Sequence, residues 1–269
     1  MSSLNDVALD KPFLLIWGPP MSGKTVLASQ FPKPTLINLD KNLNSVKALR
    51  AKYGLDFNFR VFTIDQSPTD DPEYAELCGK NFGNLSAWEK FKKLVEVLSR
   101  KMTDEETLII DSITRAGEYL VQYLIYITKH KPLQIQDWGS FVDEFNMFLD
   151  CVKSSTCKAS VILIGHDRFD RAEVSGDWRR TLIIPTSVRD RIPSLVTDSL
   201  YMKIDIRGSA NTRKVKRILQ SKPDPITTSG SRCLIPDIEF PTYAKLRPHL
   251  EVGFGRKFGE PTWTPPVDE

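Results

Sequence analysis

Apolar and polar positions along the first two thirds of the chain predict strands and helices in alternation. Short unbroken apolar runs are typical of strands buried on both faces, and we expect such strands at residues 13–17, 35–39, 59–64, 107–111 and 159–165. Between these runs apolar residues recur at helical spacing, and we expect helices at 25–31, at 42–53, from 86, after 112 and from about 137. This alternation predicts an α/β fold with a mainly parallel sheet and helices on both of its faces.

The pattern changes after residue 165, where shorter apolar stretches are joined by turns. We expect strands at 181–184, 199–206, 214–221 and 233–235, with one helix near 187–196. From Phe240 onward Pro, Gly and aromatic residues dominate, which favours a loosely ordered tail. The sequence therefore predicts one domain over residues 1–236, which ends in a β-rich C-terminal extension, and a tail over residues 237–269.

Composition narrows the class of protein without giving a function. The chain has 269 residues and a net charge of only +3, so its total charge says little about nucleic-acid binding. Its cysteines form no C-x-x-C pair, and with the scattered histidines they give no zinc-binding spacing. The N-terminus lacks the basic and apolar stretches of a signal peptide, and no apolar run approaches membrane-spanning length. We therefore expect a soluble cytoplasmic protein with no membrane partner.

The first chemical landmark is a glycine-containing loop between the first expected strand and a helix. It consists of Gly18, Pro19, Pro20, Met21, Ser22, Gly23, Lys24 and Thr25, which fits the P-loop pattern G-x-x-x-x-G-K-[ST]. Such a loop turns backbone N–H groups toward a polyphosphate, and residues without a bulky Cβ let it curl tightly. We expect Lys24 to reach the β- and γ-phosphates and the Thr25 hydroxyl to ligate Mg²⁺. The sequence therefore predicts ATP and Mg²⁺ as cofactors.

The second landmark is Asp111, which ends the buried strand expected at 107–111. A carboxylate at a strand tip beside the P-loop strand fits the Walker B role, in which it holds Mg²⁺ together with Thr25. A simple turn residue is the other interpretation of an acid at a strand end. The next residue is Ser112, whereas a hydrolytic acid at that place would suggest the AAA+ class.

These motifs carry a resemblance to a known family. The run Leu-Ile-Ile-Asp-Ser-Ile-Thr at 108–114 resembles the RecA-type version of this strand. The P-loop, together with Asn-Leu-Asp at 38–40 and Gly-His at 165–166, is similar to a family of bacteriophage ATP-binding proteins that includes RecA-like, Sak-type single-strand annealing proteins. The resemblance covers roughly residues 11–236. It implies a RecA-like P-loop ATPase domain that acts on single-stranded DNA in phage recombination or replication, in the host cytoplasm.

The resemblance implies site roles that stay open at this point. A hydrolytic glutamate is implied at or beyond the tip of the third strand, where Glu89 is the candidate, but its spacing from Ser86 also fits a helix capping box. Asp40 and Asp65 compete for the same role. His166 lies where the family has a polar sensor of the γ-phosphate, although a lone histidine at a strand end is often structural.

Two basic segments are candidates for contact with binding partners, namely a neighbouring subunit and single-stranded DNA. Residues 198–232 contain eight basic and three acidic residues, and the resemblance implies that Lys222 or Arg232 reaches the γ-phosphate of a neighbouring subunit in a homo-oligomeric ring or filament. Lysines that protect an edge strand are the alternative. Residues 166–180 interleave cations with aromatics, which suits single-stranded DNA, yet their acids and Gly176 also fit an ordinary hairpin. The tail is a candidate segment for docking on a single-strand binding protein.

Three functions follow from these patterns. The leading one is a DNA-stimulated ATPase. The second is an ATP-dependent assembly switch that hydrolyses little, because the hydrolytic base is unassigned. The third is a small-molecule P-loop kinase, which the sequence disfavours because residues 66–84 carry only Lys80 in place of an arginine-rich lid.

Overall fold

The structure is a computed structural model, and it describes residues 11–55, 57, 59–64, 79, 82–171, 176–207 and 214–265. The strands are β1 (Phe13–Gly18), β2 (Pro34–Asn38), β3 (Arg60–Phe62), β4 (Thr107–Asp111), β5 (Ser160–Arg171), β6 (Trp178–Leu182), β7 (Asp198–Arg207), β8 (Lys214–Gln220), β9 (Gly230–Ser231) and β10 (Ile238–Glu239). The helices are α2 (Lys24–Ala28), α3 (Asn44–Tyr53), the short 3₁₀ helix η1 (Phe82–Asn84), α5 (Ala87–Lys101), α6 (Ile113–Thr128), α7 (Ile135–Lys153), α8 (Thr186–Arg189), α9 (Ile192–Leu195) and α10 (Tyr243–Phe254).

The main sheet has the strand order β10-β8-β7-β1-β5-β4-β2-β3. Strands β7, β1, β5, β4, β2 and β3 run parallel, and β8 and β10 extend the β7 side in antiparallel orientation. The predicted α/β fold class is confirmed, including the mainly parallel sheet and the additional C-terminal strands. The expectation that the Asp111 strand lies directly beside the P-loop strand is wrong, because β5 pairs with β1 on one side and with β4 on the other.

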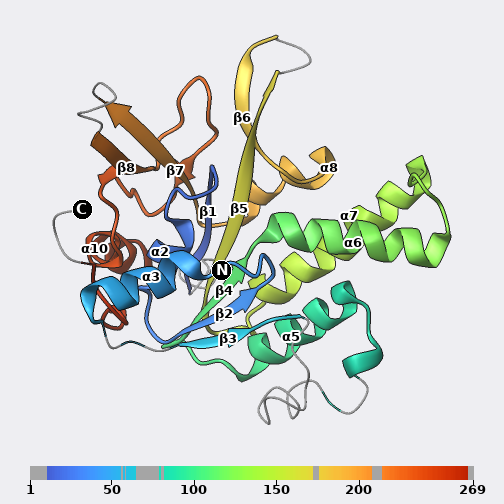
Figure 1. Ribbon diagram of the computed structural model, residues 1–269, viewed down its shortest axis with the longest axis horizontal. Coiled ribbons are helices and arrows are strands. Elements are labelled where there is room, and N and C mark those ends of the chain that lie inside the picture. The colour runs from blue at the N-terminus through green and yellow to red at the C-terminus, as the bar shows by residue number, and fades with distance from the viewer. Residues whose placement is uncertain are drawn as a thin grey trace, which may run out of the picture.

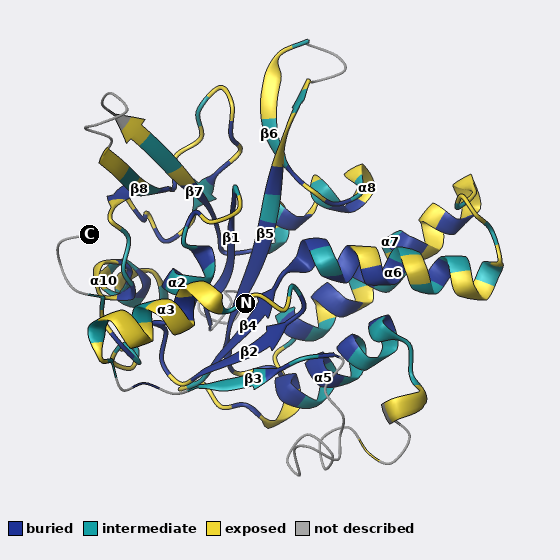
Figure 2. Ribbon diagram, in the orientation of Figure 1, coloured by how far each residue is buried: buried dark blue, intermediate teal, exposed yellow. Residues whose placement is uncertain are grey.

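Alternate residues of the central strands enter separate cores on the two faces of the sheet. Helices cover both of these faces (Figure 1). In β1, Phe13 and Leu15 belong to the larger core with α5, α6 and α7, whereas Leu14 and Ile16 belong to the smaller core with α2 and α10. Figure 2 shows the central strands buried along their length, except where β5 runs out beyond the sheet. Burial on both faces explains why these strands read as unbroken apolar runs.

Strand β5 continues past the end of its apolar run. It reaches Arg171 and pairs antiparallel with β6, from Asp167 opposite Leu182 to Arg171 opposite Trp178. This β5–β6 hairpin projects from the sheet at the top of Figure 1. The hairpin interpretation of residues 166–180 is therefore confirmed, and contact of this segment with single-stranded DNA stays a prediction. Residues 172–175 lie outside the described part of the chain.

The expectation of a loosely ordered tail is wrong for residues 238–265. Thr242 caps α10, because its hydroxyl oxygen accepts a hydrogen bond from the Lys245 N–H at 3.3 Å. Tyr243, Leu246 and Leu250 of this helix are buried in the smaller core. The strand expected at 233–235 is also wrong, since the described chain has β9 before that stretch and β10 after it. The boundary at residue 236 stays a prediction.

The end of the described chain packs against the C-terminal end of α2, the helix that follows the P-loop. The Thr262 N–H donates to the Gln30 carbonyl oxygen at 2.9 Å, and the Trp263 ring N–H donates to Ser29 Oγ at 3.2 Å. Ser29 and Gln30 directly follow α2, so these bonds satisfy polar groups at the end of that helix. The C-terminal segment therefore supports the element that carries Lys24 and Thr25.

Leu246→Ala is expected to lower the free energy of unfolding by about 2–5 kcal/mol, because it removes a fully buried side chain from the smaller core. Urea denaturation followed by circular dichroism measures the change. Val252→Ala is the matched control, since Val252 lies on the same helix and is 82% exposed. Equal midpoints for the two variants would show that α10 does not pack on the core.

No helix in the described ranges is both long and apolar enough to cross a membrane.

Candidate active site

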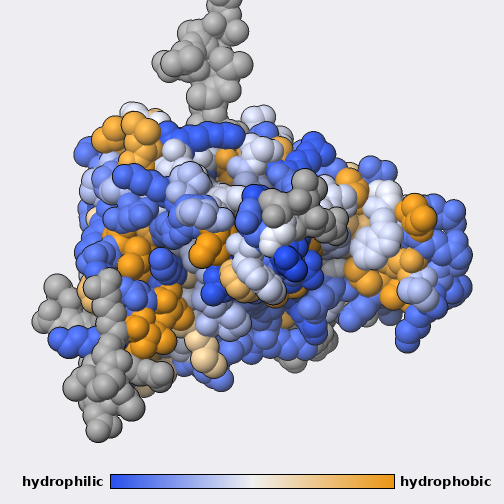
Figure 3. Space-filling model, turned by 90° about the horizontal axis from the view of Figure 1, so that it is seen from above, coloured by the Kyte–Doolittle hydropathy of each residue, from blue (hydrophilic) through white to orange (hydrophobic). Residues whose placement is uncertain are grey.

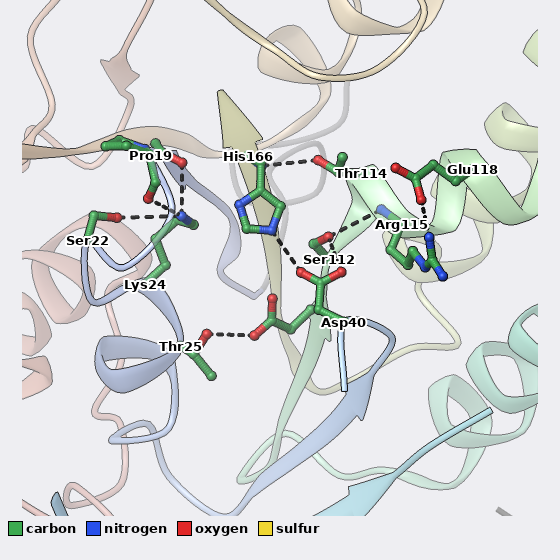
Figure 4. A network of polar contacts seen from close by, with 12 residues as sticks. Pro19, Ser22, Lys24, Thr25, Asp40, Ser112, Thr114, Arg115, Glu118 and His166 are labelled. Carbon is green, nitrogen blue, oxygen red and sulfur yellow. Dashed lines mark hydrogen bonds and ion pairs between the residues drawn. The ribbon is translucent and has the colours of Figure 1, made fainter. Parts of the chain in front are cut away.

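The P-loop connects β1 to α2 and closes around the Lys24 side chain (Figure 4). Glycine is needed at its two ends: Gly18 has a φ of +146° and a Cβ there would lie 2.6 Å from the Met202 carbonyl oxygen, while Gly23 has a φ of +99°. Lys24 Nζ donates to the carbonyl oxygens of Gly18 at 2.9 Å and Pro19 at 2.7 Å. The lysine is therefore held inside a narrow cradle of the kind that receives a polyphosphate.

The Lys24 side chain keeps the positive charge that contact with phosphate oxygens requires. Its side chain is buried, and burial lowers the pKa of the ammonium group to about 8, while the carboxylates of Asp111, Asp167 and Asp40 act in the opposite direction. At neutral pH the lysine therefore stays mostly protonated. An ammonium group held among carbonyl oxygens can turn to phosphate oxygens that enter the loop.

Thr25 and Asp111 place two oxygen groups side by side next to the P-loop. The Thr25 hydroxyl donates to Asp111 Oδ2 at 2.6 Å. Burial raises the pKa of the Asp111 carboxyl to about 6, and the hydrogen bond from Thr25 partly opposes that shift. A hydroxyl and a carboxylate side by side are hard oxygen ligands, which fit Mg²⁺ when phosphate oxygens and water complete its shell. A bound Mg²⁺ would neutralise charge on the phosphates. Among the described residues no group of three or more His, Cys, Asp or Glu side chains offers another metal site.

A second polar pair lies at the same edge of the sheet (Figure 4). His166 Nε2 on β5 lies 2.8 Å from Oδ2 of Asp40, and the Ser112 hydroxyl donates to Asp40 Oδ1 at 3.0 Å. Burial alone would raise the pKa of the Asp40 carboxyl, but these hydrogen bonds and the charges of His166 and Arg115 bring it below its usual value. Asp40 is therefore ionised, and because a carboxylate only accepts hydrogen bonds, Nε2 of the histidine carries a proton.

The other ring nitrogen of His166 faces the P-loop. Nδ1 is buried without a hydrogen-bond partner among the described residues, and Figure 4 shows it on the side of the ring toward Lys24. The backbone N–H of His166 donates to Thr114 Oγ1 at 3.1 Å, which fixes this part of the strand. A buried polar atom without a partner costs free energy, so the ring is oriented to meet a polar group that enters from the P-loop side.

Comparisons with known proteins show the family of the chain. A protein-family model described as an AAA domain, AAA_24, matches residues 10–233. The chain belongs to this family. Among solved structures the chain is similar to the flagellar accessory protein FlaH of Methanocaldococcus jannaschii, at 12% sequence identity and a TM-score of 0.37, with 78% of each chain covered. No curated protein matched the sequence.

As a member of the AAA_24 family the protein is a P-loop nucleotide-binding protein of the ATPase type, for which Mg²⁺ is the usual companion ion. The P-loop side chains and Asp111 lie together as the sequence predicts for such a site. The acid expected directly after Asp111 in the AAA+ class is replaced here by Ser112, whose hydroxyl is used to hold Asp40.

In this AAA_24 protein Glu89 is engaged at the start of α5. The Ser86 N–H and hydroxyl donate to Glu89 Oε2 at 2.8 and 2.7 Å, and the Glu89 N–H donates to Ser86 Oγ at 3.3 Å. The predicted capping box is therefore confirmed. Within the described residues no contact joins Glu89 to the P-loop, and its hydrolytic role stays a prediction. Asp65, the third candidate for that role, lies outside the described residues.

Lys222 and Arg232 do not contact the P-loop in the part of the chain that the structure describes. One guanidinium nitrogen of Arg232 donates to the Ser194 carbonyl oxygen of its own chain at 2.8 Å. Lys222 is exposed, and its backbone N–H donates to Asp237 Oδ1 at 3.2 Å. Their roles toward a neighbouring subunit stay predictions.

Sequence reasoning does not find two residues that the structure brings to the site. Ser112 becomes the hydrogen-bond donor to Asp40, and its position directly after a strand-tip acid is a signal that could have pointed there. Arg217 of β8 lies against Gly23, with Cδ at 3.3 Å and Nε at 3.5 Å from the place of a Cβ. The sequence marks Arg217 only as one of several basic residues in a strand.

Proposed function

We propose that this protein is a Mg²⁺-dependent ATPase that acts on single-stranded DNA in phage recombination or replication. The observation that carries the proposal is the Thr25–Asp111 pair at 2.6 Å beside the loop that encloses Lys24, because it joins a phosphate cradle to a cation site. Lys24 would neutralise the phosphates of ATP, and Thr25 and Asp111 would hold the Mg²⁺. ATP and Mg²⁺ are therefore the cofactors of the proposal.

We assign His166 to the contact with the terminal phosphate of ATP. We assign Asp40 to the attacking water. Asp40 is preferred to Glu89 because it lies in the cluster at the P-loop edge, where its two oxygens accept from Ser112 and His166, whereas Glu89 belongs to the cap of α5. The carboxylate holds the Nε2 side of the ring, so Nδ1 is directed at the P-loop. With Nε2 bonded to Asp40, Nδ1 donates to a phosphate oxygen only when the ring carries both protons, and in that form His166 is the polar sensor that the family resemblance implies. Asp40 positions it.

The β5–β6 hairpin is the surface we assign to single-stranded DNA. Phe169 and Trp178 stack on each other with ring centroids 5.1 Å apart, and they are 48% and 56% exposed. The Arg180 guanidinium lies over the Phe169 ring at 5.3 Å. Exposed rings for bases beside cations for phosphates are what sequence-tolerant single-strand binding requires. Figure 3, a view from the side on which this hairpin projects in Figure 1, has a largely hydrophilic surface.

The base of the hairpin is linked to the nucleotide site. Asp167 follows His166, is 7% exposed, and accepts hydrogen bonds from Arg180 at 2.8 Å and from the Tyr201 hydroxyl at 3.0 Å. The Tyr201 ring packs edge-on against Trp17 of the P-loop strand, with centroids 4.8 Å apart. Packed side chains therefore connect His166 to the proposed DNA surface, and a movement of His166 on ATP binding would be transmitted through them.

Trp178→Ala is expected to weaken binding of a fluorescent oligo(dT) by about tenfold, because the loss of one stacking platform removes that much binding energy. Fluorescence anisotropy with ATP and Mg²⁺, at two salt concentrations, measures the affinity. Tyr126→Ala is the control, since Tyr126 is 69% exposed on α6. If Trp178→Ala and wild-type protein bind the oligonucleotide equally well, the hairpin is not the DNA surface.

An assembly switch that hydrolyses little is the second candidate function. It is favoured by the engagement of Glu89 in a capping box, which leaves Asp40 and His166 as the polar groups at the site. The homo-oligomer that both functions require is supported by apolar surface where α6 and α7 project, with Ile127 50% and Ile135 93% exposed, and Figure 3 shows apolar side chains at that end of the molecule. A single-strand binding protein as partner and a cytoplasmic location remain parts of the proposal.

A further inference from the structure

The C-terminal strands pass close to the P-loop. β7 pairs with β1, and the Met202 carbonyl oxygen would lie 2.6 Å from a Cβ at Gly18. β8 pairs with β7, with Arg217 opposite Ile204. The Arg217 side chain lies over the other end of the loop, where its Cδ would be 3.3 Å and its Nε 3.5 Å from a Cβ at Gly23. A residue with a side chain at Gly23 would therefore crowd this arginine.

Strand geometry explains the direction of Arg217. Successive residues of a strand point to opposite faces, so Arg217 shares its face with Leu219. Leu219 is fully buried in the smaller core with α2, the helix that follows the P-loop. Lys216 points to the other face, where it forms an ion pair with Glu239 of β10. The nucleotide-binding helix and Arg217 thus lie on the same side of the sheet.

The guanidinium group is available for a ligand. Among the described residues the structure records neither a hydrogen bond nor an ion pair for the Arg217 side chain, and the residue is exposed. Its Cδ and Nε lie beside Gly23, in the loop that carries the charge of Lys24. Because this cation has no ion pair to break, it can meet the negative charge of phosphate oxygens at that loop without losing a partner.

We infer that Arg217 binds the phosphates of a nucleotide held by the P-loop of its own chain. The inference rests on the proposed function, and it adds a phosphate-binding residue from the C-terminal strands to a site otherwise built from the core. Arginine suits this role because its planar group offers several donors to phosphate oxygens and stays charged at all physiological pH values. Arg217 acts within one chain, in contrast to the roles toward a neighbour predicted for Lys222 and Arg232.

The test is the affinity for ATP of wild-type protein, Arg217→Ala, Arg217→Lys and Lys214→Ala, measured by equilibrium dialysis with Mg²⁺. Lys214 is the matched control, because it is exposed on the same strand and lies on the opposite face from Arg217. We expect Arg217→Ala to bind ATP about ten- to a hundredfold more weakly, the loss typical of a hydrogen bond to a charged group. Arg217→Lys should recover part of the loss, and Lys214→Ala should bind as the wild type does.

The outcomes separate this inference from the proposed function. If wild-type protein binds ATP and Arg217→Ala binds it as tightly as Lys214→Ala, the inference is wrong and the ATPase proposal stands. If the wild-type protein binds no ATP, the proposed function is wrong, and the inference that rests on it is wrong as well. A mixture of Arg217→Ala with Lys24→Ala protein tests the placement: binding that recovers in the mixture would put Arg217 in a neighbour's site and overturn the assignment within one chain.

Discussion

Lys24→Ala is expected to lower the affinity for ATP by about a hundredfold or more and to abolish turnover. The ammonium group is the one cation that the loop itself places inside its cradle, 2.9 and 2.7 Å from the carbonyl oxygens of Gly18 and Pro19. Phosphate oxygens in that cradle would lose a charge-assisted hydrogen bond and the neutralisation of their charge. Both losses act in a buried site, where water replaces the missing group poorly.

A fluorescent ATP analogue gives the affinity of this variant, and a coupled assay gives its turnover. Lys33→Ala is the control, because Lys33 is largely exposed and forms an ion pair with Glu105. Thermal denaturation without nucleotide must accompany both, since the alanine leaves two loop carbonyl oxygens without their donor. A folded Lys24→Ala protein with undiminished ATP turnover would refute the P-loop assignment.

Asp111→Asn is expected to reduce Mg²⁺-dependent ATP turnover by about a hundred- to a thousandfold. The substitution keeps the size of the side chain but removes the negative charge that would hold the cation beside Thr25. Loss of one preorganised charged contact to the transition state has an effect of this size in other enzymes. Nucleotide binding in the absence of Mg²⁺ should change little, because Lys24 and the loop remain.

The fold should tolerate this change well. Burial raises the pKa of the Asp111 carboxyl to about 6, so the folded protein holds this charge at a cost that asparagine removes. We expect the melting temperature without Mg²⁺ to be no lower than that of wild type, and the rise in melting temperature on adding ATP with Mg²⁺ to shrink. Asp150→Asn, at an exposed position of α7, is the control. A full Mg²⁺ response in Asp111→Asn would exclude the residue as a metal ligand.

Much of the core could be predicted from the sequence because it depends on local pattern. The alternation of Leu14 and Leu15 between two cores requires a strand with both faces buried, which an unbroken apolar run indicates. The position of β5 between β1 and β4 could not be predicted, because strand order depends on packing across the sheet. The hairpin was visible only as an alternative, since the extension of β5 to Arg171 is polar.

The C-terminal helix is missed for a different reason. α10 contains Pro248 and lies in a stretch dominated by Pro, Gly and aromatic residues, which favoured a tail over the helical spacing of Tyr243, Leu246 and Leu250. It forms because Leu246 and Leu250 fill the face of the sheet beside α2. Tertiary packing here outweighs local propensity.

The residues of the site also fall into those that a local pattern predicts and those that tertiary packing brings together. The P-loop and Asp111 could be predicted because each belongs to a motif with fixed spacing. The contact between Asp40 and His166 joins residues 126 positions apart, and the approach of Arg217 to Gly23 joins residues on different strands and loops. Neither leaves a local pattern. Asp40 and His166 meet where parallel strands end, and Arg217 reaches the loop from β8, which pairs antiparallel with β7.

Steady-state ATP hydrolysis by the purified protein, with and without single-stranded DNA and at two salt concentrations, tests the central claim most directly. We expect Mg²⁺-dependent hydrolysis that single-stranded DNA stimulates, with weaker stimulation at the higher salt concentration because phosphate contacts are screened. Tight ATP binding with no hydrolysis under any of these conditions would contradict the ATPase proposal and favour the assembly switch.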